Sequence, residues 1–129
     1  ESKIPTTYTD PSGLNPYNSQ LSTITIKWDE SSTDEVKQER IITQKWIANW
    51  MLGNEAWADY RRTGYPKLIP TTDEGNMSGG TVDNKKGARR MPYPSAEYID
   101  NTVNVQYAVN NYLKRADNMA TDLWWACKP

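Results

Sequence analysis

The most informative absences in this 129-residue sequence are histidine and phenylalanine, of which it has none. Without histidine the chain lacks the commonest metal ligand and the usual general base near neutral pH. The single cysteine, Cys127, excludes a disulfide within the chain. The absence of histidine also excludes Cys–His and Ser–His catalytic pairs. No acidic cluster has the spacing of metal ligands. We expect no metal, no cofactor and no catalytic residue.

Apolar residues and net charge are also scarce. The apolar fraction is 36%, below the roughly 45–50% of typical globular domains. No apolar run approaches the roughly 18 residues of a membrane-spanning helix. The net charge of −1 gives no electrostatic footprint for nucleic acid, and the local basic run of Lys85, Lys86, Arg89 and Arg90 is expected to be a solvated loop.

The sequence starts at Glu1 rather than at a methionine, and no signal peptide is recognisable. We interpret it as a processed or truncated piece. Its aromatic residues are 6 Trp and 8 Tyr, and rings of these two types carry a polar group that suits partly buried sites and can stack on sugar. Most of the tryptophans have helical core spacing, so packing is the favoured interpretation. A piece this small cannot bury them all, and we expect an exposed apolar patch.

Residues 31–66 carry the start and stop signals of two consecutive helices. Residues 31–33 are Ser-Ser-Thr, which supply candidate N-caps for the first helix. Gly53 is expected to end it in a left-handed conformation, with Asn54 capping the second helix. The second helix is expected to stop at Gly64.

Charged residues fall within the apolar half of the first expected helix. Glu39 and Arg40 share this half, and a buried charge is tolerated only when it is paired. We expect at least one of them to be buried, with Arg61 or Arg62 as a possible partner. The apolar members of the half are Val36, Ile42, Trp46, Ile47, Trp50 and Met51.

The second expected helix places Trp57 and Arg61 four residues apart, where a guanidinium can stack on an indole. Glu55, Asp59 and Arg62 share the other side. The two carboxylates resemble an acid pair for sugar hydrolysis. Salt bridging explains the same residues and is favoured, because ion-pair networks are the commoner source of such clusters.

The rest of the chain is expected to be irregular for most of its length. Residues 1–30 read as an irregular, extended lead-in, with a short strand or extended segment at 21–28. Residues 71–89 hold four glycines and no aromatic residue, which predicts a long mobile loop. Residues 90–129 read as an extended segment, a turn capped by Ser95, a last helix capped by Asn104 and a Trp-Trp end. The fold class is mainly α, with long irregular loops and little strand.

Four segments in this order resemble one protein family. They are ERIITQKWIA (39–48), GNEAWADYRRTGYP (53–66), RMPYP (90–94) and LWW (123–125). Over residues 24–125 the chain resembles the C-terminal part of the RagB/SusD family, in its SusD-like branch. The second segment is the most specific. Ala126 departs from the family, in which an acidic residue often follows the two tryptophans.

The resemblance implies the C-terminal portion of the SusD-like helical fold. It also implies a non-catalytic surface lipoprotein of the outer membrane in Bacteroidetes-type bacteria. Such proteins bind glycans or other nutrients and lie over a TonB-dependent transporter. The expected partners are this transporter, the N-terminal part of the same protein and the nutrient. In relatives the N-terminal part carries the lipid anchor, for which Cys127 is wrongly placed, and builds most of the ligand site.

The present region is therefore expected to act mainly as scaffold or partner contact and to bind glycans weakly by itself. Two alternatives stay open: a small glycan-active enzyme that uses Glu55 and Asp59, and an interaction module without a ligand. The residues expected to form the structural motif are Glu39, Arg40, Trp46, Glu55, Trp57, Asp59, Tyr60, Arg61, Arg62, Gly64, Tyr65, Pro66, Trp124 and Trp125.

Overall fold

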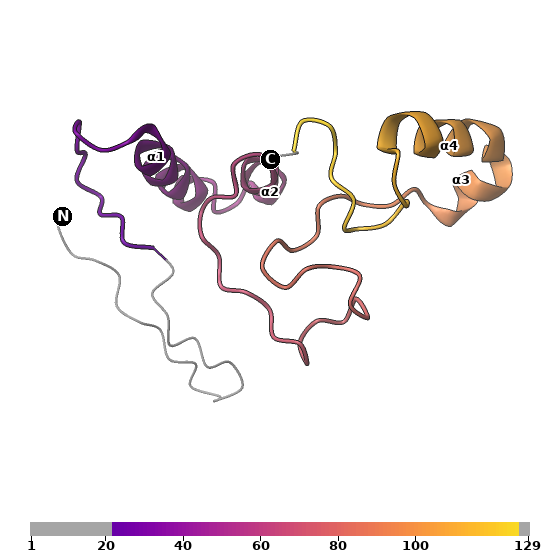
Figure 1. The fold of residues 1–129 in the computed structure, drawn as a ribbon, viewed down its shortest axis with the longest axis horizontal. Coiled ribbons are helices and arrows are strands. Elements are labelled where there is room, and N and C mark those ends of the chain that lie inside the picture. Colours follow the sequence, from indigo (N-terminus) through magenta and orange to yellow (C-terminus); the bar gives the residue numbers. More distant parts are fainter. Residues whose placement is uncertain (1–21, 127–129) are drawn as a thin grey trace. The chain divides into compact units, whose positions relative to one another are not determined.

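A computed structural model describes residues 22–126 of the chain, which divides into two compact units, residues 1–69 (unit 1) and 70–129 (unit 2). Unit 1 contains α1 (Asp34–Ala48) and α2 (Gly53–Thr63), and unit 2 contains α3 (Ser95–Asp100), α4 (Thr102–Ala108) and the π-helical turn η1 (Val109–Leu113) (Figure 1). Within residues 22–126 no strand forms, which confirms the mainly α fold class. The strand considered for residues 21–28 is wrong over 22–28, which are coil and bends.

The ends of α1 and α2 follow the predicted signals only in part. Thr33 caps α1, and its side chain accepts a hydrogen bond from the Val36 N–H at 3.4 Å. Gly64 ends α2 with a φ of 75°, as predicted. The prediction for Gly53 and Asn54 is wrong, because α1 already ends at Ala48 and Gly53 is the first residue of α2.

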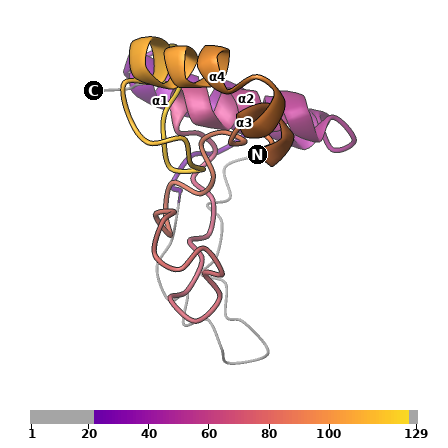
Figure 2. The same ribbon diagram turned by 90° about the vertical axis from the view of Figure 1, so that its right-hand side faces the viewer.

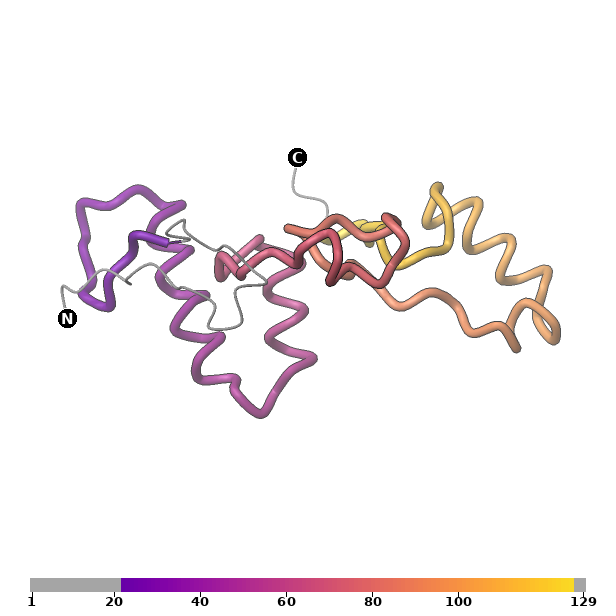
Figure 3. The backbone as a smooth tube through the Cα atoms, turned by 90° about the horizontal axis from the view of Figure 1, so that it is seen from below, coloured from indigo at the N-terminus to yellow at the C-terminus, as the bar shows by residue number. Residues whose placement is uncertain are grey.

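The turn between the helices explains this difference. The Asn49 N–H donates to the Lys45 carbonyl at 2.9 Å, and the Leu52 N–H donates to the Asn49 carbonyl at 2.8 Å. These bonds satisfy groups at the end of α1 without a left-handed residue. The result is a hairpin of two helices joined by a tight turn (Figure 3).

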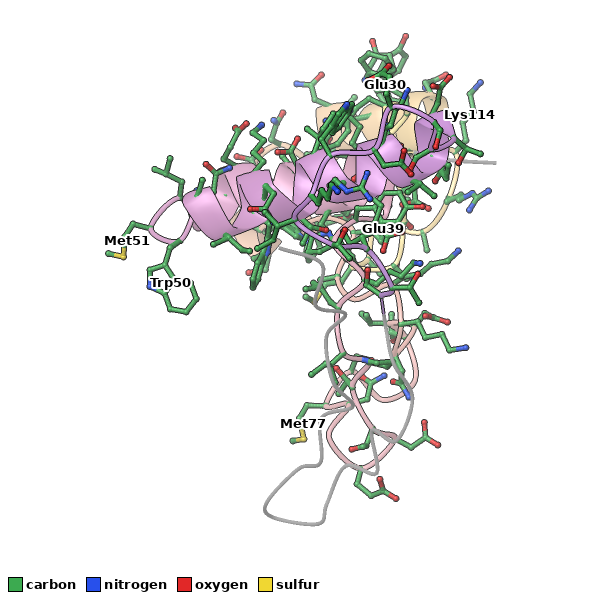
Figure 4. The ribbon with its side chains drawn as sticks, turned by 90° about the vertical axis from the view of Figure 1, so that its left-hand side faces the viewer. Glu30, Glu39, Trp50, Met51, Met77 and Lys114 are labelled. Carbon is green, nitrogen blue, oxygen red and sulfur yellow. The ribbon has the colours of Figure 1, made fainter. Side chains whose placement is uncertain are left out.

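The interior of unit 1 is small and unusually polar. Among residues 22–69, the buried apolar residues are Ile42, Ala56 and Pro66, whereas Glu39, Arg40, Asp59, Arg61 and Thr63 are buried polar or charged residues. The apolar half predicted for α1 is therefore mostly uncovered. Trp50 is 78% exposed and Met51 86%, and both project from the α1–α2 turn (Figure 4). A single partner helix is too short to cover this face.

In unit 2, residues 70–94 contain no helix (Figure 2). Side chains organise their first part: the Asn76 amide donates to the Val82 carbonyl at 2.7 Å, and the Asn84 amide donates to Asp73 at 2.6 Å. The Thr71 N–H donates to the Asn84 carbonyl at 3.0 Å and so joins the two ends of the loop. The mobility expected for residues 71–89 stays a prediction.

The helices of unit 2 begin at other residues than predicted. Ser95 is the first residue of α3 rather than its cap, and α4 begins at Thr102, so Asn104 lies inside it. Lys114, with a φ of 54°, closes η1. Val105 is the one buried residue of α4, and Tyr112 is 73% exposed. None of the helices in residues 22–126 has the length and hydropathy needed to cross a membrane.

Candidate functional site

The helical pair of unit 1 forms an apolar groove of about 310 Å³, here called the α1–α2 groove. Aromatic side chains from both helices and their turn dominate its lining, and no charged residue contributes to it. The lining residues are Trp46, Asn49, Trp50, Gly53, Ala56, Trp57, Tyr60 and Leu68.

Helical spacing brings these residues to one face. Trp46, Asn49 and Trp50 lie at positions i, i+3 and i+4 of α1 and its turn, although Asn49 and Trp50 come after the last helical residue. Residues 53, 56, 57 and 60 repeat the same spacing along α2. Gly53 and Ala56 are small, so the larger rings around them leave a hollow.

Arg61 holds one ring of this groove. Its guanidinium carbon lies 3.7 Å from the centroid of the Trp57 ring, and Arg61 is only 8% exposed. The predicted stacking of this pair is confirmed. A stacked guanidinium restricts the rotamers of Trp57, so this wall of the groove is preorganised.

The carboxylates considered for sugar hydrolysis are both ion-paired. Lys45 Nζ lies 2.8 Å from Glu55 Oε1 and 2.7 Å from Asp59 Oδ2, and Arg62 donates to Asp59 Oδ1 at 2.9 Å. Burial tends to raise the pKa of Asp59, but hydrogen bonds from Lys45 and Arg62 outweigh it and lower the pKa below the usual value. Hydrogen bonds to Asp59 and, second, to Glu55 raise the pKa of Lys45 above its usual value. Neither carboxylate lines the α1–α2 groove.

Glu39 and Arg40 are both buried, with exposed fractions of 4% and 7%. Glu39 accepts a hydrogen bond from Ser22 Oγ at 2.7 Å and pairs with Lys67 Nζ at 3.1 Å. Arg40 Nε donates to the Thr25 carbonyl at 2.8 Å. The expected burial is correct, but Ser22, Thr25 and Lys67 are partners that helical spacing could not reveal.

The end of the helical pair has one further polar contact. The Tyr65 hydroxyl donates to Glu35 Oε1 at 2.6 Å, and this hydrogen bond, more than burial, raises the pKa of Tyr65 to about 12. Pro66, which follows Tyr65, is buried.

In unit 2, the predicted solvated loop is wrong for Arg89 and Arg90, which are 8% and 6% exposed. Arg89 Nε donates to Asp122 Oδ1 at 2.5 Å, and Arg89 Nη2 donates to the Ala126 carbonyl at 3.3 Å. Arg90 forms an ion pair with Asp117. Their acidic partners are far away in sequence, so the local basic run looked unpaired.

Asp117 is the centre of this cluster. Its Oδ2 accepts from the Tyr98 hydroxyl at 2.6 Å and from the Tyr93 N–H at 3.0 Å. Burial opposes ionisation, but the hydrogen bonds from Arg90, Tyr98 and Tyr93 prevail and lower the pKa of Asp117. The network joins residues 90–98 to residue 117. The lowered pKa of Asp117 is the opposite of the raised pKa that a catalytic carboxylic acid needs.

The remaining residues considered in the sequence do not form a site in the described part of the chain. Trp124 is 87% exposed and Trp125 is half-buried. Among residues 22–126, no three His, Cys, Asp or Glu side chains gather in a metal-binding arrangement. Cys127 lies outside the described residues.

Three comparisons place the chain among known proteins. A family model described as SusD-like, "Susd and RagB outer membrane lipoprotein", matches residues 1–126. A search of the curated proteins found no match. Among solved structures, a SusD homologue from Bacteroides uniformis has a TM-score of 0.94 and 71% identity over 99% of this chain.

More distant structures agree. A chitin-binding SusD homologue from Flavobacterium johnsoniae has a TM-score of 0.85 and 41% identity over 99% of this chain. A SusD homologue from Bacteroides thetaiotaomicron has a TM-score of 0.85 and 38% identity over 100% of it. The chain covers 26%, 26% and 28% of these three proteins, about a quarter of their length. With the family model matched over nearly its whole length, the chain belongs to the SusD-like family of outer membrane lipoproteins.

Proposed function

We propose that this chain is a region of a non-catalytic glycan-binding protein that assists nutrient uptake at the bacterial outer membrane. The observation that carries the proposal is the 41% identity, over 99% of the chain, with a homologue named as chitin-binding. Within such a protein this region acts mainly as scaffold.

The contacts of the chain support a scaffold role. Its buried charges are used within the chain: Glu39 pairs with Lys67, Asp59 with Lys45, and Asp117 with Arg90. A binding site for a polar ligand would instead aim several such groups at the ligand. The loop at 71–87 contains no aromatic ring for stacking on sugar.

The proposed setting follows the family. The whole protein would be lipid-anchored through an N-terminal part and exposed at the cell surface. It would contact a TonB-dependent transporter and deliver a glycan to it. The present region would bind the remaining part of the same protein and contribute to the transporter contact.

Two features count against the alternative of a glycan-active enzyme. A glycosidase needs one carboxyl group protonated near neutral pH, with its pKa raised. Asp59 has a lowered pKa, and ion pairs with Lys45 hold both Asp59 and Glu55. We expect the wild-type chain to release reducing sugar ends no faster than the buffer, and Glu55→Gln and Asp59→Asn to leave that level unchanged.

Calorimetric titration tests the proposal. One sample is the isolated chain, and the other is a chimera in which this chain replaces the matching quarter of the Bacteroides uniformis homologue. Chitin oligosaccharides and a panel of host and dietary polysaccharides serve as ligands. We expect the chimera to bind at least one glycan and the isolated chain to bind weakly or not at all. Tight binding by the isolated chain, lost in Trp50→Ala or Trp124→Ala, would contradict the scaffold role.

A further inference from the structure

A second hollow of unit 1, here called the Arg40 hollow, lies between α1 and the segment that precedes it. Its volume is about 320 Å³, and in contrast to the α1–α2 groove most of its lining is polar or charged. The lining residues are Thr25, Lys27, Trp28, Asp29 and Arg40. All of them come from residues 25–40, so one continuous stretch of the chain builds the hollow.

Arg40 differs from the other buried charges of the chain in having no counterion. Glu39, Asp59 and Asp117 each pair with a basic side chain. Arg40 is only 7% exposed, and its Nε donates to the Thr25 carbonyl at 2.8 Å. Among residues 22–126, however, no carboxylate forms an ion pair with it. A buried charge without a counterion is costly, so an anion placed beside Arg40 would be stabilised.

The other charges of the hollow leave its lining positive. Lys27 is exposed and forms no ion pair in the part of the chain that the structure describes. Asp29 opposes it, but both of its oxygens are used: Oδ1 accepts from the Ser31 hydroxyl at 2.7 Å and Oδ2 from the Ser32 hydroxyl at 2.9 Å. Two cations and one carboxylate give the lining a net charge of +1. The hollow therefore favours an anion over a cation.

Trp28 adds a flat apolar surface next to these charges. Its Nε1 donates to Glu30 Oε2 at 2.7 Å, which fixes the orientation of the indole, and the residue is 48% exposed. The nearest cationic groups, those of Lys37 and Arg40, lie 5.9 and 6.0 Å from the ring centroid, compared with 3.7 Å for the stacked pair of α2. Neither is in close stacking contact, so the ring keeps surface for a ligand.

We propose that the Arg40 hollow is a subsidiary binding site for a uronic acid residue of a glycan, with the sugar ring against Trp28 and its carboxylate toward Lys27 and Arg40. A bare anion would use the cations alone, whereas a sugar ring with a carboxylate uses the indole as well. The volume of about 320 Å³ is at the lower end of ligand pockets and suits one ring rather than a long chain.

The two cations have different parts in this site. Lys27 is exposed and can contact the carboxylate directly. Arg40 Nη1 is enclosed within the protein, so Arg40 acts through the surface that lines the hollow and through the field of its charge, which is screened less than that of an exposed group. With one direct charge contact the binding should be weak. The proposal rests on the glycan-binding function proposed above and adds a ligand contact to a region that is otherwise scaffold.

Fluorine NMR of the chimera, labelled with fluorotryptophan, tests the site. Trp28→Phe identifies the resonance of Trp28. The probes are trigalacturonate, its methyl ester, which has the same rings without the charges, and triglutamate, which has carboxylates without sugar rings. We expect trigalacturonate to shift the Trp28 resonance, the methyl ester to bind at least about tenfold more weakly, and triglutamate to leave the resonance in place.

Three results would overturn the proposal. The first is no shift of the Trp28 resonance with trigalacturonate, as expected if other polypeptide fills the hollow. The second is an equal shift with the methyl ester, which would remove the role of the charge. The third is an equal shift with triglutamate, which would make the hollow a contact for acidic protein segments.

Lys27→Ala provides the second measurement. It should weaken trigalacturonate binding about fivefold, the upper end of what one exposed charge contributes, and wild-type binding should weaken as salt is raised. Lys86→Ala is the matched control, since it removes one exposed lysine from unit 2 and should change nothing. Equal affinities in Lys27→Ala and Lys86→Ala would contradict the site. Arg40→Gln should abolish the shift, and it is compared only if its circular dichroism matches that of the parent; the two lysine variants decide the question without it.

Titration of the same chimera with the glycan panel separates this site from the proposed function. Binding of a panel glycan without a trigalacturonate shift at Trp28 contradicts only the site. A charge-dependent shift at Trp28 in a chimera that binds none of the panel glycans contradicts only the function proposed for the whole protein.

Discussion

The two double arginines of this chain, residues 61–62 in unit 1 and 89–90 in unit 2, pair with carboxylates over very different distances. In unit 1 the ion pair reaches Asp59, three residues away on the same helix. In unit 2 the pairs reach Asp117 and Asp122, 27 and 33 residues away. The first kind of pair joins two side chains of one helix, whose backbone already fixes their positions. The second kind joins two segments that are themselves outside the helices, residues 89–90 and 117–122.

Burial follows the same division. The side chain of Arg62 is 51% exposed, whereas those of Arg90 and Asp117 are 7% and 6% exposed. Water screens an exposed ion pair, so its loss changes stability little. A buried charge that loses its partner is neither paired nor solvated, which destabilises the fold strongly. The difference in burial predicts that replacing an ion-pair residue lowers stability much more in unit 2 than in unit 1.

The largest effect is expected for Asp117→Ala. It would leave the buried Arg90 without its counterion and remove acceptors from Tyr93 and Tyr98. Breaking a buried pair costs about 3–5 kcal/mol. Urea titration followed by circular dichroism would measure the loss for unit 2. Asp100→Ala, an exposed carboxylate of α3, is the control.

The pH dependence of Asp117 sharpens this test. Its pKa in the folded chain is below the ordinary value of 3.8. Its contribution to stability is therefore present above that value and is lost as the pH falls through the lower, folded pKa. Asp117→Asn should flatten the acid end of the stability profile. A profile with the same slope in both proteins would contradict the role given to this carboxylate.

The next effect is expected for Arg61→Ala, which removes the guanidinium from the Trp57 ring. A desolvated cation–π contact contributes about 2 kcal/mol. Thermal melting should show the loss, and the Trp57 fluorescence should change with it. Arg61→Lys is the control, since it keeps the charge but stacks less well. Arg61→Ala and Arg62→Ala without any effect would show that the double arginine of unit 1 has no structural role.

A smaller effect is expected for Tyr65→Phe, which removes the hydrogen bond from the Tyr65 hydroxyl to Glu35. One such bond contributes about 1 kcal/mol. The pKa of Tyr65 is raised from 10.0 to about 12, so this contribution is present below pH 10 and disappears as the pH rises toward 12. Absorbance titration of tyrosinate in the wild type and in Tyr65→Phe would locate the group that titrates last. A Tyr65 that ionises at its ordinary pH would contradict the contact.

The smallest effect is expected for Arg62→Ala. The exposed pair with Asp59 should contribute no more than about 0.5 kcal/mol, and less at high salt. Moreover, Lys45 would still neutralise Asp59 at 2.7 Å. The same urea titration, repeated in 1 M salt, checks this. A loss as large as that of Asp117→Ala would remove the contrast between the two double arginines.

The features that the sequence predicted correctly depend on positions three or four residues apart. The helical pair, the Thr33 cap, the stop at Gly64 and the stacking of Arg61 on Trp57 all belong to this kind. The stacking could be predicted because a helix fixes which side chains are neighbours. The structural-motif role of these residues in the whole family stays a prediction.

Contacts between distant segments could not be predicted. Nothing local relates Arg89 to Asp122 or Glu39 to Lys67. The prediction for Gly53 failed for a different, local reason, since the turn from Asn49 to Leu52 satisfied its own backbone groups. The apolar half of α1 was identified as a pattern, but the pattern does not reveal that Ile47, Trp50 and Met51 stay exposed within the described residues.

The closed loop of unit 2 has a practical consequence for experiments on cells. The hydrogen bond from the Thr71 N–H to the Asn84 carbonyl, with an N···O distance of 3.0 Å, joins the ends of this loop. Between them, Gly79 and Gly80 adopt left-handed conformations, with φ of 62° and 82°. Doubling the length of such a loop costs only about 0.6 kcal/mol of closure entropy. A short epitope tag inserted between the two glycines should therefore leave the helical pair folded. Antibody staining of intact bacteria would then report directly on which side of the envelope this region lies.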